Sequence, residues 1–136
     1  MAALAAERNT VQAADVQRSP HSWPQGTNTI YKGSLVVLNA SGFAEPGTTA
    51  TAKTAVGRAK KTQVNAGSPG AVEIEVEEGE FWWANAGGDP VVAATRGLLC
   101  YITDDQTVNV TATGKSAAGK VMRLDTALGV LVRTVL

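Results

Sequence analysis

The residues best suited to chemistry are five glutamates close together in the middle of the chain. They are Glu73, Glu75, Glu77, Glu78 and Glu80. Three of them alternate with apolar residues, so in a strand they would share one face at about 7 Å from one to the next. That spacing would permit the carboxylate pair of a glycosidase. Nothing nearby suggests a sugar cleft, so the pattern favours a solvated strand face, which could also meet a basic patch on a partner.

A second candidate is the segment 114–121, which reads Gly-Lys-Ser-Ala-Ala-Gly-Lys-Val and comes within one residue of a phosphate-binding P-loop. Val121 stands where the motif needs the hydroxyl of Ser or Thr to bind Mg²⁺. A P-loop is also followed by a helix whose N-terminus faces the phosphate, whereas residues 121–124 are typical of a strand. The sequence therefore predicts a glycine-containing loop between strands.

The remaining reactive side chains are too isolated to form a catalytic or metal site. His21 is the only histidine and has no partner for nucleophilic catalysis. Cys100, inside an apolar run, is predicted to be a buried small hydrophobe, and one His with one Cys leaves too few ligands for zinc. Asp104 and Asp105 could in principle hold Ca²⁺, but their Thr-Asp-Asp-Gln context favours a hairpin turn. We therefore expect no catalytic, cofactor or metal site, and no enzyme.

Length and charge limit the class of protein. The chain has 136 residues, enough for a single core, and 12 basic residues balance 12 acidic ones. Without excess positive charge, nucleic acid is not an expected partner. There is no apolar run of about 18 residues and no signal-like start, so no membrane association is expected and the protein should be made in the cytoplasm.

The elements that must position these residues are strands. Residues 30–38 form a long β-rich run with Gly33 as a bulge or kink, 45–54 is expected to be a loop, and 56–64 is expected to be an exposed strand with solvent-facing basic residues. Residues 72–77 alternate most clearly, 80–85 form another strand, and 98–136 is typical of a β-meander. We find no internal repeat and no second domain. The prediction is an all-β fold, a single β domain over residues 30–136, built as a compact antiparallel β-sandwich or small β-barrel.

Residues 1–29 differ from the rest and are predicted to be an extended N-terminal arm. Pro20 and Pro24 oppose regular ladder pairing, and the segment has too few apolar residues for a core. The adjacent Trp82 and Trp83 must point to opposite faces of a strand, so one can be core while the other is exposed or covered by the arm or a partner subunit. Trp23, Trp82 and Trp83 are therefore the candidate partner-interface residues.

Several short pieces, in order along the chain, carry a family resemblance. They are 32–36 and 38–42 near the start, Val76 with 78–82 and Asn85 in the middle, and 104–108 with 118–121 near the end. In order and spacing the chain resembles the head-decoration, or structural cement, proteins of tailed bacteriophages and prophages.

The resemblance implies a non-enzymatic virion protein that binds the outer surface of the expanded phage head. Such a protein stabilises contacts between major capsid proteins, commonly as a homotrimer at local three-fold positions, and is expected on the capsid exterior of the virion. The family supplies no catalytic residues and no cofactor. Two other classes remain open, a phage tail or baseplate structural β protein and a carbohydrate-binding β module that uses its tryptophans as a stacking platform.

Overall fold

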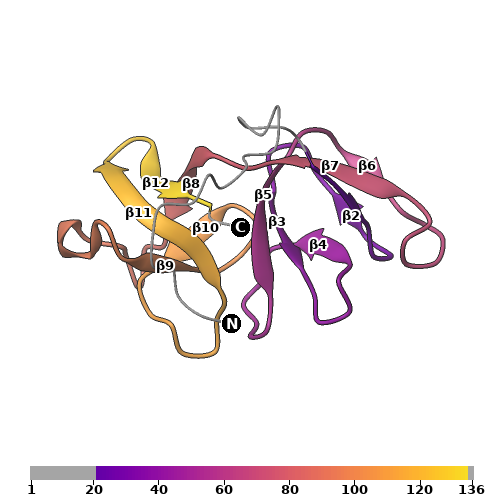
Figure 1. The fold of residues 1–136 in the computed structure, drawn as a ribbon. Helices are drawn as coiled ribbons and strands as arrows, with labels where there is room; N and C mark the ends of the chain where they lie inside the picture. The colour runs from indigo at the N-terminus through magenta and orange to yellow at the C-terminus, as the bar shows by residue number, and fades with distance from the viewer. Residues whose placement is uncertain (1–20, 135–136) are drawn as a thin grey trace, which may run out of the picture.

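The computed structural model describes residues 21–134, and this part of the chain consists of strands joined by loops and one 3-10 turn (Figure 1). In chain order the strands are β1 (His21–Pro24), β2 (Thr29–Ile30), β3 (Leu35–Leu38), β4 (Ala44–Pro46), β5 (Thr54–Ala59), β6 (Gln63–Val64), β7 (Glu73–Glu77), β8 (Glu80–Asn85), β9 (Leu99–Ile102), β10 (Thr107–Asn109), β11 (Ala117–Asp125) and β12 (Gly129–Arg133). The turn η1 (Ala93–Thr95) lies between β8 and β9. The predicted all-β class is confirmed. Among the described residues, no helix has the length and apolar character needed to cross a membrane.

The first half of the chain forms a five-stranded sheet that curls on itself. Its order is β1-β7-β5-β3-β4, and all neighbouring strands are antiparallel. The outer strands meet where Gln25, directly after β1, forms a parallel bridge with Ala44 of β4. There the N–H of Gly26 donates to the carbonyl of Ala44 at 2.9 Å. The curled sheet encloses a first core of Ile30, Val36, Ala44, Val56, Ala59, Ile74 and Val76.

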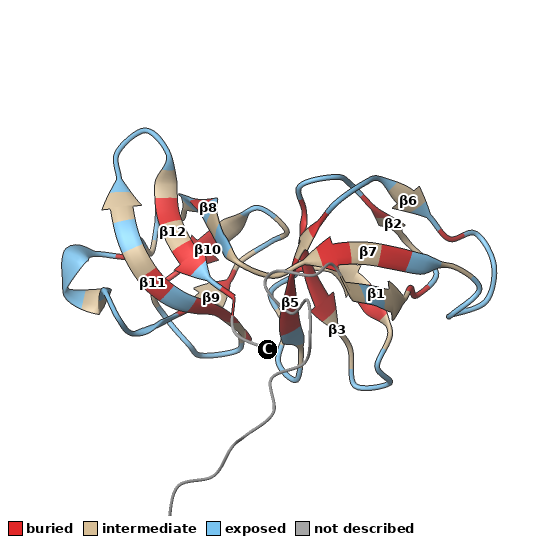
Figure 2. Cartoon of the chain, turned by 45° about the horizontal axis from the view of Figure 1, so that its top comes forward, coloured by how far each residue is buried: buried red, intermediate tan, exposed pale blue. Residues whose placement is uncertain are grey.

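The second half forms a closed five-stranded barrel. Its order is β8-β12-β11-β9-β10, and parallel pairing of β10 with β8 closes the ring. Buried residues alternate with exposed ones along these strands (Figure 2). The sequence left sandwich and barrel open, and the structure has a barrel here. The interior of this barrel is lined by Trp83, Cys100, Ile102, Val108, Val121, Val130 and Val132.

The two halves share one pairing scheme. Strands β1, β7, β5, β3 and β4 of the first half correspond in order to β8, β12, β11, β9 and β10 of the second. In both halves every neighbouring pair is antiparallel, except the closing contact, which is parallel. We call residues 21–77 repeat 1 and residues 80–134 repeat 2. The two halves thus repeat one five-stranded topology, which strand pairing closes into a barrel in repeat 2 and a single bridge closes in repeat 1.

Individual contacts repeat in the same positions. The N–H of Gly33 donates to Ala59 O at 3.0 Å, and the N–H of Gly97 donates to Val121 O at 2.7 Å. The strand registers give a consistent set of equivalent residues. These include Trp23 and Trp83, Leu35 and Leu99, Val36 and Cys100, Val37 and Tyr101, Leu38 and Ile102, Ala44 and Val108, Ala55 and Ala117, Arg58 and Lys120, and Val76 and Val132.

Two equivalent glycines show why this backbone recurs. Gly57 in β5 has φ +134° and Gly119 in β11 has φ +149°, a region that side chains rarely adopt. A Cβ on Gly57 would lie 2.2 Å from the carbonyl oxygen of Glu77, and a Cβ on Gly119 would lie 2.2 Å from that of Arg133. The pairing of β5 with β3 and of β11 with β9 shifts register next to these residues. Each glycine therefore permits a bulge that bends its strand around a barrel.

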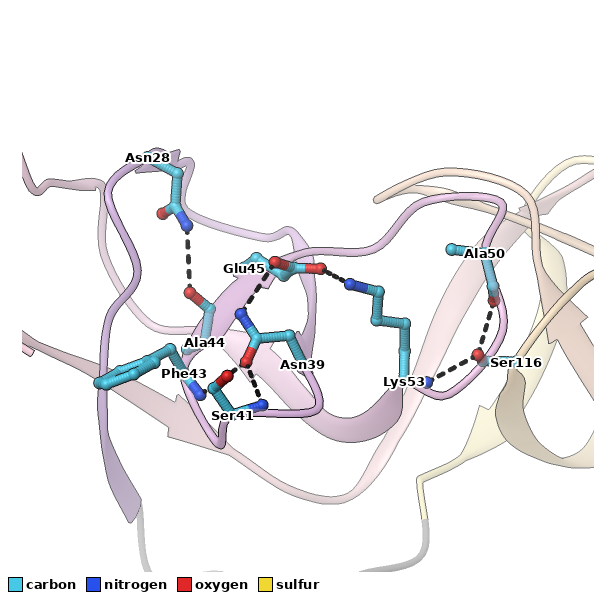
Figure 3. Close-up of polar contacts among 9 residues, drawn as sticks. All are labelled: Asn28, Asn39, Ser41, Phe43, Ala44, Glu45, Ala50, Lys53 and Ser116. Carbon is cyan, nitrogen blue, oxygen red and sulfur yellow. Dashed lines mark hydrogen bonds and ion pairs between the residues drawn. The ribbon is translucent and has the colours of Figure 1, made fainter. Parts of the chain in front are cut away.

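The repeats pack through a shared core. Leu35, Val37 and Ala55 lie on the outer face of repeat 1 and join the core of repeat 2, so β3 is buried on both faces. The N–H of Leu35 donates to Asp105 O at 2.8 Å, which places the 103–106 turn of repeat 2 against β3. Ser116 adds hydrogen bonds to the loop before β5, from Lys53 N–H at 3.1 Å and to Ala50 O at 2.7 Å (Figure 3).

The expectation of no internal repeat is wrong, and loop length explains why. Trp23 corresponds to Trp83, but Leu35 corresponds to Leu99 and Val76 to Val132, so no fixed period relates the repeats. Repeat 1 also carries the extra β2-β6 ribbon, which has no strand counterpart in repeat 2.

The N-terminal boundary of the fold also differs from the prediction of an arm over residues 1–29. Residues 21–24 pair with β7 as β1, and residues 29–30 pair with β6 as β2. Pro24 is tolerated because β1 is an outer strand of the sheet and Pro24 lies at its end, where a missing N–H does not interrupt a central ladder. The rest of the predicted arm, residues 1–20, lies outside the described residues.

Three further expectations need correction. The predicted strand over 30–38 is interrupted by a turn at Gly33, whose φ is +88°. The predicted exposed strand over 56–64 is instead β5, a central strand with Val56 and Ala59 buried, followed by the short β6. The C-terminal third is not a simple meander, because β11 pairs with β9 and β12 rather than with β10.

Candidate functional site

Three of the five clustered glutamates, Glu73, Glu75 and Glu77, lie on β7, and two of them pair with cations in or directly after the neighbouring β5. Arg58 forms an ion pair with Glu77, and Lys60 Nζ lies 4.0 Å from a carboxylate oxygen of Glu75. The guanidinium of Arg58 also lies 4.3 Å from the centre of the Phe81 ring. The alternate residues of β7 point into the core, which confirms that these glutamates share one outward face. Cross-strand charge pairing therefore explains why Glu75 and Glu77 face outward next to Arg58 and Lys60.

The paired aspartates lie in a turn, but the P-loop-like segment is part turn and part strand. β11 begins at Ala117, so the expected loop is limited to residues 114–116, and a strand rather than a helix follows it. The carboxylate of Asp104 accepts from the N–H of Gln106 at 2.9 Å, and that of Asp105 accepts from Ser34 Oγ at 3.3 Å. The predicted hairpin turn between β9 and β10 is confirmed. In residues 21–134 no three His, Cys, Asp or Glu side chains gather in a way that could hold a metal ion.

The thiol and the imidazole are both part of the barrel packing. Cys100 is buried, as predicted, and burial raises the pKa of its thiol to about 12, so it is neutral and unreactive near pH 7. His21 in β1 packs beside Trp23, with ring centres 6.3 Å apart. The equivalent pair in repeat 2 is Phe81 and Trp83, with ring centres 6.2 Å apart. The position of His21 is therefore an aromatic packing position.

The three tryptophans take two different places. Trp23 and Trp83 occupy equivalent positions at the two cores, and the indole nitrogens of both are buried. Trp82 is 38% exposed while Trp83 is 4% exposed, which confirms that the adjacent pair faces opposite sides of β8. Trp83 therefore packs the barrel interior and does not reach a partner surface in this fold. Trp82 is the one of the three that projects outward from a barrel wall.

Trp82 belongs to a continuous outer surface on β8, β12 and β11, which we call the barrel wall. One row across the three strands contains Trp82, Leu131 and Arg123, and the next contains Glu80, Arg133 and Lys120. Residues opposite each other in adjacent strands have Cβ atoms about 5 Å apart, so each row is contiguous. Arg133 and Glu80 are joined by an ion pair of 2.8 Å.

The composition of the barrel wall suits a protein partner. Tryptophan and arginine dominate the energetics of protein interfaces because they combine large contact area with hydrogen bonding. The two rows contain three basic side chains, Lys120, Arg123 and Arg133, and one acidic side chain, Glu80. Their net charge is therefore positive and would complement an acidic surface. The wall presents no nucleophile and no acid-base pair, so its chemistry is that of binding.

The sequence analysis identified Trp82 but missed the rest of the barrel wall. The available signal was the alternation over 129–133, in which Val130 and Val132 are buried while Leu131 and Arg133 face outward. The pairing of β12 with β8, which places Leu131 beside Trp82, could not be read from that alternation.

One shallow cleft of the described surface, about 290 Å³, lies beside Tyr31 and Gln106 and is lined by Lys32, Ser34 and Asp105. The hydroxyl of Ser34 is hydrogen-bonded to Asp105, without a histidine to activate it. This cleft therefore offers hydrogen bonding but not nucleophilic catalysis.

Comparison of the chain with protein-family models, with curated proteins and with solved structures found no match.

Proposed function

We propose that this chain is a non-enzymatic virion structural protein, a decoration or cement protein that binds the outer surface of the expanded head of a tailed phage. It would act as a homotrimer that contacts several major capsid proteins and stabilises their mutual contacts. The barrel wall would supply the contact with the capsid.

The observation that carries this proposal is a difference between the two repeats. At the position of Trp82, repeat 1 has Ser22, and at the position of Leu131 it has Glu75. The same barrel is therefore built without an indole on its outside. Because an exposed tryptophan does not stabilise the isolated chain by burial, its presence on repeat 2 supports a binding role.

The segments that carry the resemblance are found in both repeats. The 38–42 and 104–108 segments form the β3-β4 and β9-β10 hairpins, and 118–121 contains the bulge at Gly119. They lie at the turning points that define each barrel.

Multivalency explains how barrel walls of modest individual affinity would keep a trimer bound to a phage head. When one subunit of a trimer is bound, the contacts of the other two become effectively intramolecular, so retention can exceed the single-site affinity by factors of about 10² to 10⁴. A cement protein needs this property because it must remain bound while each single contact is weak.

The experiment is co-sedimentation with expanded empty heads assembled from the major capsid protein of the same phage or prophage. Wild type should bind saturably, and Trp82→Ala should weaken binding at least tenfold, as truncation of an interface hot spot does. Leu128→Ala is the matched control, because Leu128 is 57% exposed but lies at the tip of the β11-β12 hairpin, outside the wall.

Two results would count against the proposal. Binding of Trp82→Ala equal to that of wild type would exclude the barrel wall as the contact surface. If the protein forms large rings or tubes and does not bind heads, the tail or baseplate alternative is favoured. If it binds glycans saturably and Trp82→Ala abolishes that binding, a carbohydrate-binding module is favoured.

A further inference from the structure

The internal duplication identifies a surface that is filled in repeat 1 and open in repeat 2. In repeat 1, Leu35, Val37 and Ala55 form an outer face that is 0%, 0% and 7% exposed, because repeat 2 packs against it. We call the equivalent outer face of repeat 2 the Leu99 face. It consists of Leu99, Tyr101 and Ala117.

The Leu99 face is only partly covered within residues 21–134, where Lys53, Thr54 and Ala55 of repeat 1 line a groove together with Leu99 and Ala117. Leu99 is 48% exposed, and Tyr101 and Ala117 are half-buried. Its neighbour Leu98 is 60% exposed. A shallow groove of about 180 Å³ runs along Leu99 and Ala117. The apolar character that repeat 1 uses for internal packing is therefore kept on repeat 2, but faces solvent.

A turn next to the face in repeat 1 also has an open counterpart. The Leu35 face packs against the apolar core of repeat 2, and the 103–106 turn lies at its edge, where the N–H of Leu35 donates to Asp105 O at 2.8 Å. The equivalent turn of repeat 1 is 39–42. The paired residues Leu38 and Ala44 are as far apart in sequence as Ile102 and Val108, and the tip of the turn, Ala40 to Gly42, is exposed. In the register of the two hairpins, Ser41 stands where Asp105 stands in repeat 2.

The 39–42 turn is already shaped for docking. The side-chain oxygen of Asn39 accepts from the N–H groups of Ser41 at 2.9 Å and Phe43 at 3.1 Å (Figure 3). The amide nitrogen of Asn39 donates to Glu45, which is also paired with Lys53. A turn held in place by these bonds loses little conformational entropy on binding.

We propose that the Leu99 face of one copy binds the 39–42 turn of a second copy, in the same way that the Leu35 face binds the 103–106 turn within the chain. The contact equivalent to that between Leu35 and Asp105 would join Leu99 to Ser41. It is a heterologous contact, because two different surfaces meet, and it leaves one face and one turn free for the next copy. This inference names the self-association surface of the trimer in the proposed function, but its test involves no capsid.

The test is the solution mass of the full chain by light scattering during size-exclusion chromatography. Wild type should have a mass of about 42 kDa, three times the 14.0 kDa of one chain. Leu99→Glu, and Ala117→Arg as a second variant of the face, should reduce it to that of a monomer. Leu128→Glu is the matched control, because it places the same charge on another exposed leucine and should leave the mass unchanged. Circular dichroism of each variant checks that the fold is kept.

Mixing two defective variants tests the heterologous geometry. Ala40→Arg blocks the turn but keeps the face, whereas Leu99→Glu blocks the face but keeps the turn. Each alone should be a monomer, and a 1:1 mixture should give dimers of about 28 kDa through the single intact contact. A monomeric wild type, a Leu99→Glu variant that keeps the wild-type mass, or a mixture that stays monomeric would overturn the inference. Failure to bind heads, with this mass pattern intact, would count against the proposed function alone.

Discussion

The bulge glycines give the sharpest test of the duplicated architecture. In Gly119→Ala, the new Cβ would lie 2.2 Å from Arg133 O, and the backbone φ of +149° would have to be kept. Backbone strain of this kind costs about 1–3 kcal/mol, and relief of overpacking costs about 1–3 kcal/mol more. We therefore expect Gly119→Ala to lower the free energy of unfolding by about 2–6 kcal/mol. Gly57→Ala should lower it by a similar amount, because Gly57 occupies the equivalent position against Glu77 O.

Substitutions at two other glycines distinguish the cost of backbone strain from the cost of a steric clash of the new Cβ. Gly33 has φ +88° and open space around its Cβ position, so Gly33→Ala should cost only the strain, about 1–2 kcal/mol. Gly87 has no atom within 4 Å of its Cβ position and no positive φ, so Gly87→Ala should stay within about 1 kcal/mol of wild type. Urea unfolding followed by tryptophan fluorescence gives all four values. The reasoning is refuted if Gly119→Ala proves as stable as Gly87→Ala, or if Gly57→Ala and Gly119→Ala differ by more than about 2 kcal/mol.

Three other predictions follow from burial and charge. Cys100 should resist thiol reagents at pH 8 until the protein unfolds, because burial raises its pKa to about 12; labelling of the native protein at the rate of a free thiol would contradict this. Trp83→Ala should lower the free energy of unfolding by about 3–5 kcal/mol and Trp82→Ala by much less, in urea unfolding, since one indole is buried and the other exposed. The hydrogen bond from the Asn109 side chain holds the pKa of Asp89 below its ordinary value, so this carboxylate stabilises the fold above that value, and the benefit disappears as pH falls through the lowered pKa. Unfolding midpoints measured from pH 2 to 7 should therefore depend less on pH in Asp89→Asn, and an unchanged profile would refute this assignment.

The sequence predicted those features that depend on neighbours along the chain. Alternation placed Ile74 and Val76 inward and the glutamates of β7 outward, and the adjacency of Trp82 and Trp83 required opposite faces. The turn at Asp104 was predicted from local turn chemistry alone. In each case the period of the strand or the geometry of one turn decides the outcome, so no long-range information is needed.

The sequence could not predict the features that depend on which strands pair. β1 was missed because its Pro24 is tolerated only at the outer edge of a sheet, and edge position is a property of the whole fold. β5 was expected to be exposed because of Arg58 and Lys60, yet those side chains pair with glutamates of β7 while Val56 and Ala59 fill the core. The barrel wall depends in the same way on the pairing of β12 with β8.

Because the two repeats share one backbone, each serves as a control for the other. Positions that are alike in both are required by the barrel: Trp23 matches Trp83, and Gly57 matches Gly119. Where the two repeats carry different outward side chains, such as Ser22 and Trp82, the barrel fold does not require a particular residue type. The outward side chains of repeat 2 are therefore not dictated by the barrel, and the partner that we propose for the barrel wall would account for them.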